Sequence, residues 1–374
     1  MSKRALLLNA KRIVVKVGTS TLTHATGKLN LYRIEKLVRE LADLANQQKE
    51  ILLVTSGAVG AGMDRLGWKE KPKAISDKQA AAAVGQGILM HIYEKLFGEY
   101  GQVVAQVLLT REDTINRKRF LNSRNTLLGL LRHGVIPIIN ENDVVAWEEL
   151  KIGENDYLSA LVAGLVDADA LVILSDVNGV YTDNPANNPA ARFLALIEEI
   201  TPEIEELAGG PGTMRGTGGM YTKIQAGKIA MNSGIPLVIA HGGVDGNIRN
   251  ILAGQEIGTL FLPKDHKLQT RKCWIAYGAM PQGRLTVDAG AERALQAGKS
   301  LLPKGLLSVE GEFEQGNIVA VFGESGKELA RGIVNYDHVE VEKIKNAHSH
   351  EIAAILGYKH FDEVIHRDNL ALLI

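Results

Sequence analysis

Apolar residues in the first two thirds of the chain alternate between short continuous runs and helically spaced stripes. Residues 12–17 (RIVVKV) are mostly β-branched and predict a short buried strand, whereas the apolar residues from Leu31 to Leu44 recur at helical spacing. The same alternation predicts further strands at 51–54, 103–109, 135–139, 170–174 and 236–240, and further helices at 80–97, 120–131, 158–166 and 223–232. Strict alternation of strand and helix predicts an α/β fold with a mainly parallel central sheet covered on both faces.

The pattern changes near residue 265. A polar connector at 264–267 is followed by shorter strand-like segments with glycine turns, at 284–287, 306–309, 318–322 and 333–334. We therefore expect a first domain at 1–265, a linker at 266–282, and a small β-rich domain with the C-terminal tail at 283–374.

Composition and charge narrow the possible partners and compartments. The chain has 374 residues, a formal net charge of −1 and 45% hydrophobic residues, so nothing draws it as a whole to nucleic acid or to an anionic membrane. No stretch approaches the roughly 18 apolar residues of a membrane span, and the apolar run at 5–8 is too short for a signal peptide. The single cysteine, Cys273, allows no intrachain disulfide. These features predict a cytoplasmic protein.

Ligands of parallel α/β sheets bind at the carboxyl ends of the strands, so the residues that follow each strand are candidates for a site. Lys16 lies within the first apolar strand, where a lysine is unfavourable unless it meets an anion. An edge lysine that reaches water explains it equally well. The glycine-rich turn at 56–62, which begins with Ser56, offers free backbone N–H groups to an anion.

Acidic and amide side chains follow the later strands. Two clusters, at 140–143 (NEND) and 153–156 (GEND), lie close together in an apolar region. Helix N-caps would account for part of the second cluster but not for both. Ser175 and Asp176 follow the strand at 170–174, and the segment 216–223 (GTGGMYTK) leads into a helix with glycines, hydroxyls and a lysine, as phosphate binding requires.

The commonest nucleotide-binding loops are absent from the sequence. There is no Walker loop, since Gly298-Lys299-Ser300 is preceded by Arg293 where the first glycine is needed, and there is no Gly-x-Gly-x-x-Gly fingerprint. No cluster of His and Cys with metal-ligand spacing is present, so no metal-ligating residue is predicted.

The order of these motifs resembles that of the amino acid kinase family. The resemblance rests on six segments and covers nearly the whole chain: KVGTS at 16–20, TSGAVGAG at 55–62, INEND at 139–143, GENDYLSA at 153–160, LSDVNGVYTDNP at 174–185 and GTGGMYTK at 216–223. It is strongest for members that act on free glutamate. In addition, the segments 285–291 and 300–305 resemble the PUA domain appended to many of those members.

The resemblance implies a fold, a reaction and partners. The fold would be a sandwich of helices around a mainly parallel sheet, followed by a small β-rich PUA-like domain. The reaction would transfer the terminal phosphate of ATP, with Mg²⁺, to the γ-carboxylate of L-glutamate. The product, L-glutamyl 5-phosphate, is the first intermediate of proline biosynthesis. Inhibition by proline, a homo-oligomer (dimer or tetramer) and hand-over of the labile product to a glutamyl phosphate reductase would accompany it.

The resemblance also assigns roles to individual residues. The two lysines that contact the transferring phosphate would be Lys16 and Lys223, with Asp156 orienting both. The substrate would be bound by Ser56, Asn140, Asp143, Glu154 and Asn155, with Asp143 as the partner of the ammonium group. ATP would be bound by Lys16, Ser175, Asp176, Thr217, Gly218, Gly219, Met220, Tyr221, Thr222 and Lys223. Glu154 stands where many members of the family have aspartate, which leaves its effect on glutamate affinity open.

Three alternatives stay open at this point. A related kinase of the same fold would act on acetylglutamate, aspartate, carbamate or UMP instead of glutamate. RNA binding through the PUA-like domain is disfavoured, because residues 283–374 contain 10 Lys and Arg against 14 Asp and Glu. A catalytically inactive regulator is disfavoured because Lys16, Asp156 and Lys223 are all present.

Overall fold

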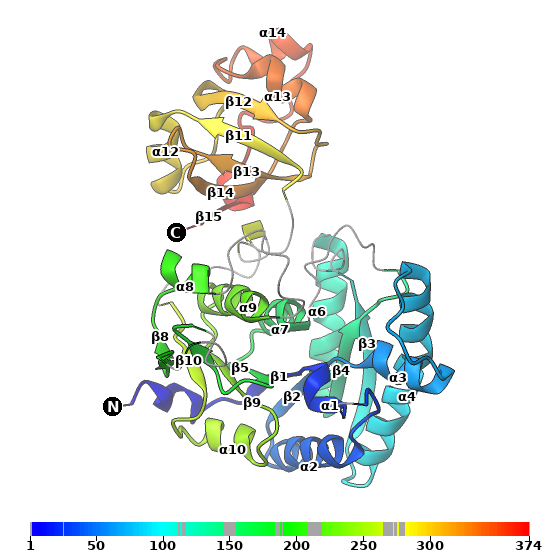
Figure 1. Ribbon diagram of the computed structural model, residues 1–374. Coiled ribbons are helices and arrows are strands. Elements are labelled where there is room, and N and C mark those ends of the chain that lie inside the picture. Colours follow the sequence, from blue (N-terminus) through cyan, green and yellow to red (C-terminus); the bar gives the residue numbers. More distant parts are fainter. Residues whose placement is uncertain are drawn as a thin grey trace. The chain divides into compact units, whose positions relative to one another are not determined.

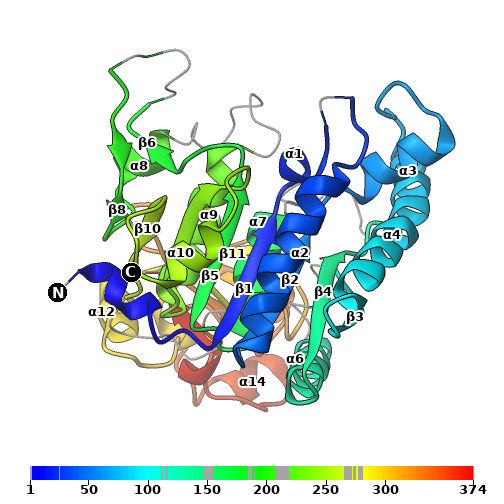
Figure 2. The same cartoon turned by 90° about the horizontal axis from the view of Figure 1, so that it is seen from below.

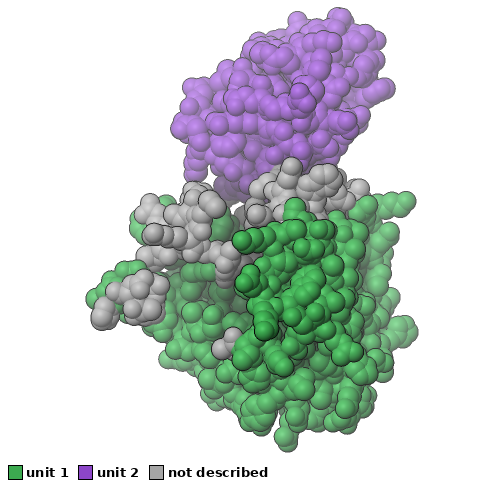
Figure 3. Space-filling view, turned by 45° about the vertical axis from the view of Figure 1, so that its right-hand side comes forward, with its two compact units in different colours: residues 1–267 green, residues 268–374 purple. Residues whose placement is uncertain are grey.

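The computed structural model of the chain describes residues 2–24, 26–110, 113, 117–145, 155–183, 188, 190–207, 219–264, 272, 275–276 and 281–373. The chain divides into two compact units, residues 1–267 and 268–374 (Figure 3). Most of the linker expected at 266–282, including Cys273, lies outside the described residues.

The first unit is built on an eight-stranded sheet with the strand order β3-β4-β2-β1-β5-β9-β10-β8 (Figure 1). All neighbouring strands are parallel except β9 and β10, which are antiparallel, so the mainly parallel sheet expected from the sequence is confirmed. The strands are β1 (Arg12–Val17), β2 (Glu50–Thr55), β3 (Val103–Leu109), β4 (Val135–Glu141), β5 (Ala170–Ser175), β8 (Leu196–Ile197), β9 (Leu237–His241) and β10 (Thr259–Phe261). A separate two-stranded ribbon pairs β6 (Val180–Tyr181) with β7 (Phe193–Leu194).

Helices cover both faces of this sheet (Figures 1 and 2). One layer contains α2 (Leu31–Asn46), α4 (Ile75–Gly98) and α10 (Asn247–Leu252), and the other contains α6 (Arg117–Arg132), α7 (Asn155–Leu165) and α9 (Met220–Asn232). The α4 helix begins five residues before the expected start. Shorter helices are η1 (Lys3–Leu7), α1 (Thr19–Leu22), α3 (Ala58–Leu66) and α8 (Pro202–Leu207). None of the helices in the described part of the chain is long and apolar enough to cross a membrane.

Alternation along β1 decides where Lys16 faces. Ile13, Val15 and Val17 belong to the core that α2 and α4 cover. Successive side chains of a strand point to opposite faces, so Val14 and Lys16 face the layer of α7 and α9. Because β1 lies between β2 and β5 in the middle of the sheet, and the Lys16 side chain is only 7% exposed, the interpretation of Lys16 as an edge lysine reaching water is wrong.

The second unit contains a five-stranded sheet with the order β12-β11-β13-β14-β15. Its elements are β11 (Gly283–Val287), α12 (Ala289–Gln296), η3 (Pro303–Gly305), β12 (Leu306–Glu310), β13 (Ile318–Phe322), β14 (Glu328–Ile333), α13 (His338–Ile344), α14 (Ile352–Leu356), η4 (Arg367–Asn369) and β15 (Leu370–Leu372). The sequence located β11, β12 and β13 but only the end of β14. It missed β15, because three residues carry too little periodicity to identify a strand.

Candidate active site

The carboxyl ends of four neighbouring strands meet at one edge of the large sheet. Val17 at the end of β1 pairs with Thr55 of β2 and with Leu174 of β5, and β2 in turn pairs with β4 near Ile139. The segments that follow these strands are those in which the sequence placed its candidate residues.

Three ionisable groups form a buried cluster at this edge. Lys16 Nζ lies 2.5 Å from Asp156 Oδ1, and Lys223 Nζ lies 3.1 Å from Asp156 Oδ2. The Asp156 side chain is fully buried, and each lysine side chain is 7% exposed. Asp156 lies in the first turn of α7 and Lys223 in the first turn of α9, and these two helices pack against each other. The fold therefore assembles a group with two cations and one anion from three distant parts of the chain.

Electrostatics keeps this carboxylate ionised. Burial by itself would raise the pKa of Asp156, but the charges of Lys16 and Lys223 and hydrogen bonds from Lys16 and Thr222 bring the pKa below its ordinary value. The Thr222 hydroxyl lies 2.9 Å from Asp156 Oδ2 and 2.9 Å from the Gly219 carbonyl oxygen. With both lysines charged, the cluster has an excess of one positive charge, which an anionic group would balance.

A chain of side-chain amides lies beside this cluster. Asn155 Nδ2 lies within hydrogen-bond distance of three acceptors, the Thr55 carbonyl oxygen at 2.7 Å, Ser56 Oγ at 2.9 Å and Asn140 Oδ1 at 2.9 Å. Asn140 Nδ2 donates to Gln86 Oε1 at 2.8 Å. The structure thus brings together Ser56, Asn140 and Asn155, three of the five residues to which the resemblance assigned substrate binding.

Gln86, on α4, is a member of this chain that the sequence did not identify. It stands between two glycines in an otherwise apolar helical stretch (AAAAVGQGIL, 80–89). A polar amide at a buried helical position was the available signal, but a helical glutamine is usually a solvated residue, and only the packed structure shows that this one is 8% exposed.

Two carboxylates lie at the end of β4, Glu141 as its last residue and Asp143 two residues beyond it. Burial raises the pKa of Asp143, and burial together with the charge of Asp143 raises the pKa of Glu141. A cation bound near them would reverse these shifts, because an opposite charge favours the ionised form. Such a position suits the ammonium group of an amino acid.

The segments expected to bind ATP are described in part. Gly219 is the N-cap of α9 and has no side-chain capping bond, so the first N–H groups of the helix, from Met220 onward, are available to an anion. Ser175, at the end of β5, is buried and donates to the exposed Asp176 at 3.0 Å. Tyr221 and Thr222 lie in the same first turn as Lys223. The expected site residues Glu154, Thr217 and Gly218 lie outside the described residues.

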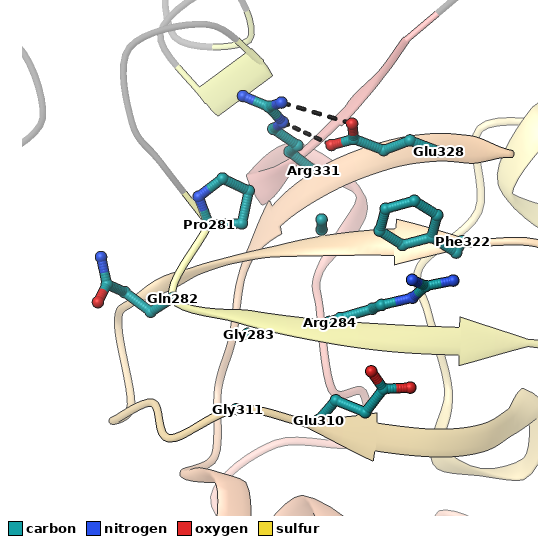
Figure 4. Close-up of a pocket in the computed structure, with 10 residues that line it drawn as sticks. Pro281, Gln282, Gly283, Arg284, Glu310, Gly311, Phe322, Glu328 and Arg331 are labelled. Carbon is teal, nitrogen blue, oxygen red and sulfur yellow. Dashed lines mark hydrogen bonds and ion pairs between the residues drawn. The ribbon is translucent and has the colours of Figure 1, made fainter. Parts of the chain in front are cut away.

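The second unit has a separate hollow on its sheet (Figure 4). The guanidinium of Arg284 lies 3.9 Å from the ring centroid of Phe322, and Arg331 Nε donates to Glu328 Oε1 at 2.7 Å. Two arginines and two glutamates line the hollow, with Glu310 as the second acid, so its charges balance. It does not provide the basic surface that RNA binding requires.

Family models match both parts of the chain. The model of the amino acid kinase family matches residues 11–241, more than half of the chain, and that of the PUA domain matches residues 283–356.

The chain is also similar to individual proteins over nearly its full length. The chain is 58% identical over 371 residues to a protein of Moorella thermoacetica named glutamate 5-kinase, covering 99% of this chain and 98% of that one. It is 57% identical over 372 residues to a protein of the same name from Carboxydothermus hydrogenoformans, covering 99% and 100%. Among solved structures, a UMP kinase from Bacillus anthracis has 17% identity and a TM-score of 0.47, covering 69% of this chain and 98% of that one; this likeness carries no weight for the substrate.

Proposed function

The chain belongs to the amino acid kinase family, and we propose that it transfers the terminal phosphate of ATP to the γ-carboxylate of L-glutamate. The product is L-glutamyl 5-phosphate, and the reaction is the first step of proline biosynthesis. The observation that carries the proposal is the identity of 58% over nearly the full length to a glutamate 5-kinase. The cluster of Lys16, Asp156 and Lys223 supports it, because its excess positive charge suits a reaction between two anions.

The chemistry needs positioning and charge neutralisation more than proton transfer. An oxygen of the substrate carboxylate attacks the γ-phosphorus of ATP, the bond from that phosphorus to the bridging oxygen breaks, and ADP leaves. The attacking carboxylate is already ionised at neutral pH, so no general base is required. Lys16 and Lys223 offset the repulsion between the carboxylate and the phosphates, and Asp156 holds both ammonium groups in place.

Both substrates have candidate partners, most of them among the described residues. We assign the ammonium group to Asp143, with Ser56, Asn140 and Asn155 as further contacts, and Glu154 as an additional substrate residue. We assign the phosphates of ATP to the segment from Thr217 to Lys223, which in the sequence precedes and begins α9, and to Ser175 and Asp176 at the end of β5. For the described residues these roles rest on their positions at one edge of the sheet. The roles of Glu154, Thr217 and Gly218, which lie outside the described residues, rest on the resemblance of the sequence alone.

Kinases of this kind use ATP with Mg²⁺, which neutralises charge on the phosphates. In proteins this ion is usually held by phosphates, water and one or two carboxylates. Asp176 is an exposed carboxylate in the proposed ATP segment, and the described residues include no cluster of three or more metal-ligating side chains. A single carboxylate, that of Asp176, fits a Mg²⁺ ion that enters the site bound to the phosphates of ATP.

Further properties belong to the same proposal. We assign residues 1–265 to the catalytic domain, 266–282 to a linker and 283–374 to the PUA-like domain with its tail. We also propose that the protein works in the cytoplasm as a homodimer or homotetramer, that proline inhibits it, and that its labile product passes to a glutamyl phosphate reductase.

The test is ADP release from ATP and Mg²⁺ in the presence of L-glutamate, with hydroxylamine to trap the acyl phosphate as a hydroxamate. N-acetylglutamate and aspartate serve as controls. Glutamate-dependent ADP release with hydroxamate formation is the expected result. Activity with a control substrate alone would retain the kinase reaction and overturn the assignment of glutamate.

A further inference from the structure

The position of Gln86 is set by unusually close contact between two helices. A Cβ added to Gly85 of α4 would lie 1.7 Å from the carbonyl oxygen of Ala58, the first residue of α3, and one added to Gly62 would lie 1.7 Å from the carbonyl oxygen of Ala81. The two helices therefore touch through their backbones at these glycines. Because α3 begins directly after the turn that contains Ser56, this contact holds the next residue of α4, Gln86, beside the substrate end of the site.

Backbone groups decide how the amides in this chain are oriented. The N–H of Glu141 donates to Asn140 Oδ1 at 2.9 Å, so the oxygen of that side chain must face the backbone and its Nδ2 must face Gln86. Gln86 consequently presents Oε1 to Asn140. In the same way, the carbonyl oxygen of Thr55 can only accept, so Asn155 must present Nδ2 to it.

Two polar atoms are left over when these bonds are made. Asn155 Oδ1 and Gln86 Nε2 are buried and have no hydrogen-bond partner among the described residues. Buried polar atoms are nearly always satisfied in folded proteins, so a buried acceptor without a partner indicates a position that a ligand or water completes. The Asn155 amide contacts Ser56 through its Nδ2, and its unpartnered acceptor Oδ1 suits a cationic donor such as the ammonium group of the proposed substrate.

We propose that Gln86 is a positioning residue for the substrate amino acid. It acts through Asn140. The Glu141 N–H sets the orientation of the Asn140 amide, and Gln86 Oε1 holds Asn140 Nδ2 in place. Asn140 Oδ1 therefore stays within reach of Asn155 Nδ2, and Asn155 Oδ1 is left to accept a hydrogen bond from the substrate ammonium group. The inference rests on the proposed function, since it concerns glutamate binding at that site.

Loss of the Gln86 acceptor would disturb the whole chain of amides. Asn140 Nδ2 would become a buried donor without its partner, or the amide would turn over and lose the bond from the Glu141 N–H. If Asn140 turned over, its Nδ2 would face Asn155 Nδ2, two donors against each other. Glutamate affinity would fall, whereas the lysines that act on the phosphate would be untouched.

The experiment compares glutamate kinetics of the full-length wild type with those of Gln86→Met, which keeps the length of the side chain and removes both polar atoms. The KM for glutamate is expected to rise about tenfold, the effect of losing one positioned hydrogen bond, with kcat and the KM for ATP nearly unchanged. In an Asn140→Ala background, Gln86→Met should add no further loss. Gln86→Glu retains an acceptor oxygen and should keep most of the wild-type affinity for glutamate. It also tests the role of the acceptor if Gln86→Met is too unstable to assay.

Tyr93→Phe is the matched control on the same helix, because it removes a buried hydrogen bond of 2.8 Å to Thr55 Oγ1. It should lower the melting temperature without changing the KM for glutamate. An unchanged KM in Gln86→Met, a KM in Gln86→Glu as high as in the Met variant, or an equal rise in Tyr93→Phe would overturn the role of Gln86. A wild type inactive with glutamate would instead overturn the proposed function, and this role with it.

Discussion

Lys16 and Lys223 bind opposite oxygens of one buried carboxylate, that of Asp156. Lys16 comes from the central strand β1 and Lys223 from the first turn of α9, so the carboxylate joins the sheet to the helix layer above it. Ammonium groups held in this way are preorganised for an incoming anion, because no further reorientation is needed when charge develops in the transition state.

Removal of one lysine should therefore reduce turnover more than substrate affinity. Lys223→Ala is expected to lower kcat by about 10²–10³-fold with a small change in the KM for glutamate. The matched control is Lys228→Ala on the same helix, since Lys228 forms an ion pair with Glu205 instead. Steady-state kinetics of ADP release measures both variants. A Lys223→Ala enzyme with normal kcat and a raised KM would remove this residue from phosphoryl transfer.

Asp156→Asn should destabilise the protein because it leaves two buried cations without their shared anion. The expected loss is about 3–5 kcal/mol of unfolding free energy, against about 0.2–1 kcal/mol for the more exposed pair of Arg124 and Asp167, tested as Asp167→Asn. Because the pKa of Asp156 is lowered in the folded protein, its contribution is present at neutral pH and is lost only as the pH falls through that lowered pKa.

ATP provides a second test of the same variant. Phosphates would replace the missing carboxylate as partners of the two lysines, so ATP with Mg²⁺ should raise the melting temperature of Asp156→Asn more than that of the wild type. Thermal unfolding with and without nucleotide measures the difference. Equal shifts would contradict the placement of the phosphates beside both lysines.

We expect the ionised Asp143 side chain to lower the stability of the folded protein while it increases the affinity for glutamate. Its pKa is raised by burial, so the folded protein favours the protonated form, and that contribution is lost as the pH rises through the raised pKa. At neutral pH, Asp143→Asn should therefore raise the melting temperature while it raises the KM for glutamate.

The pH dependence of the wild type follows from the same group. Glutamate affinity should weaken as the pH falls through the raised pKa of Asp143, because the protonated acid no longer attracts an ammonium group. This loss of affinity at low pH should be absent from Asp143→Asn. Asp64→Asn, which changes a half-exposed residue of α3, is the control. If Asp143→Asn had a normal KM for glutamate and the same loss of affinity at low pH as the wild type, Asp143 would be excluded as the partner of the ammonium group.

The close contact of α3 and α4 can be tested with two glycines on one helix. Gly85→Ala should destabilise the protein by about 1–3 kcal/mol, because the added methyl group meets the backbone of Ala58. Gly87→Ala has nothing within 4 Å of the added Cβ and should stabilise by about 0.5–1 kcal/mol through its helix propensity. Thermal or denaturant unfolding compares them, and similar effects of both substitutions would argue against the backbone contact.

Much of the first unit could be predicted from local pattern. The strand of Lys16 and the helix that contains Lys223 were located from apolar periodicity, and the polar segments after the strands marked one edge of the sheet. The short strands β8 and β10 could not be found, since two or three residues carry no measurable period. Gln86 could not be recognised either, because its burial depends on how closely α3 and α4 approach each other.

By itself the sequence determined the long strands and helices of the first unit, because that information lies in the spacing of neighbouring side chains within one turn or one strand. It also determined that acidic, amide and glycine residues follow several strands. Only the tertiary structure decided which of those residues meet. The order of the strands in the sheet differs from their order in the chain, and this order brings α7 beside α9 and thus Asp156 between Lys16 and Lys223. Contacts of this kind depend on packing between distant segments, which no local spacing records.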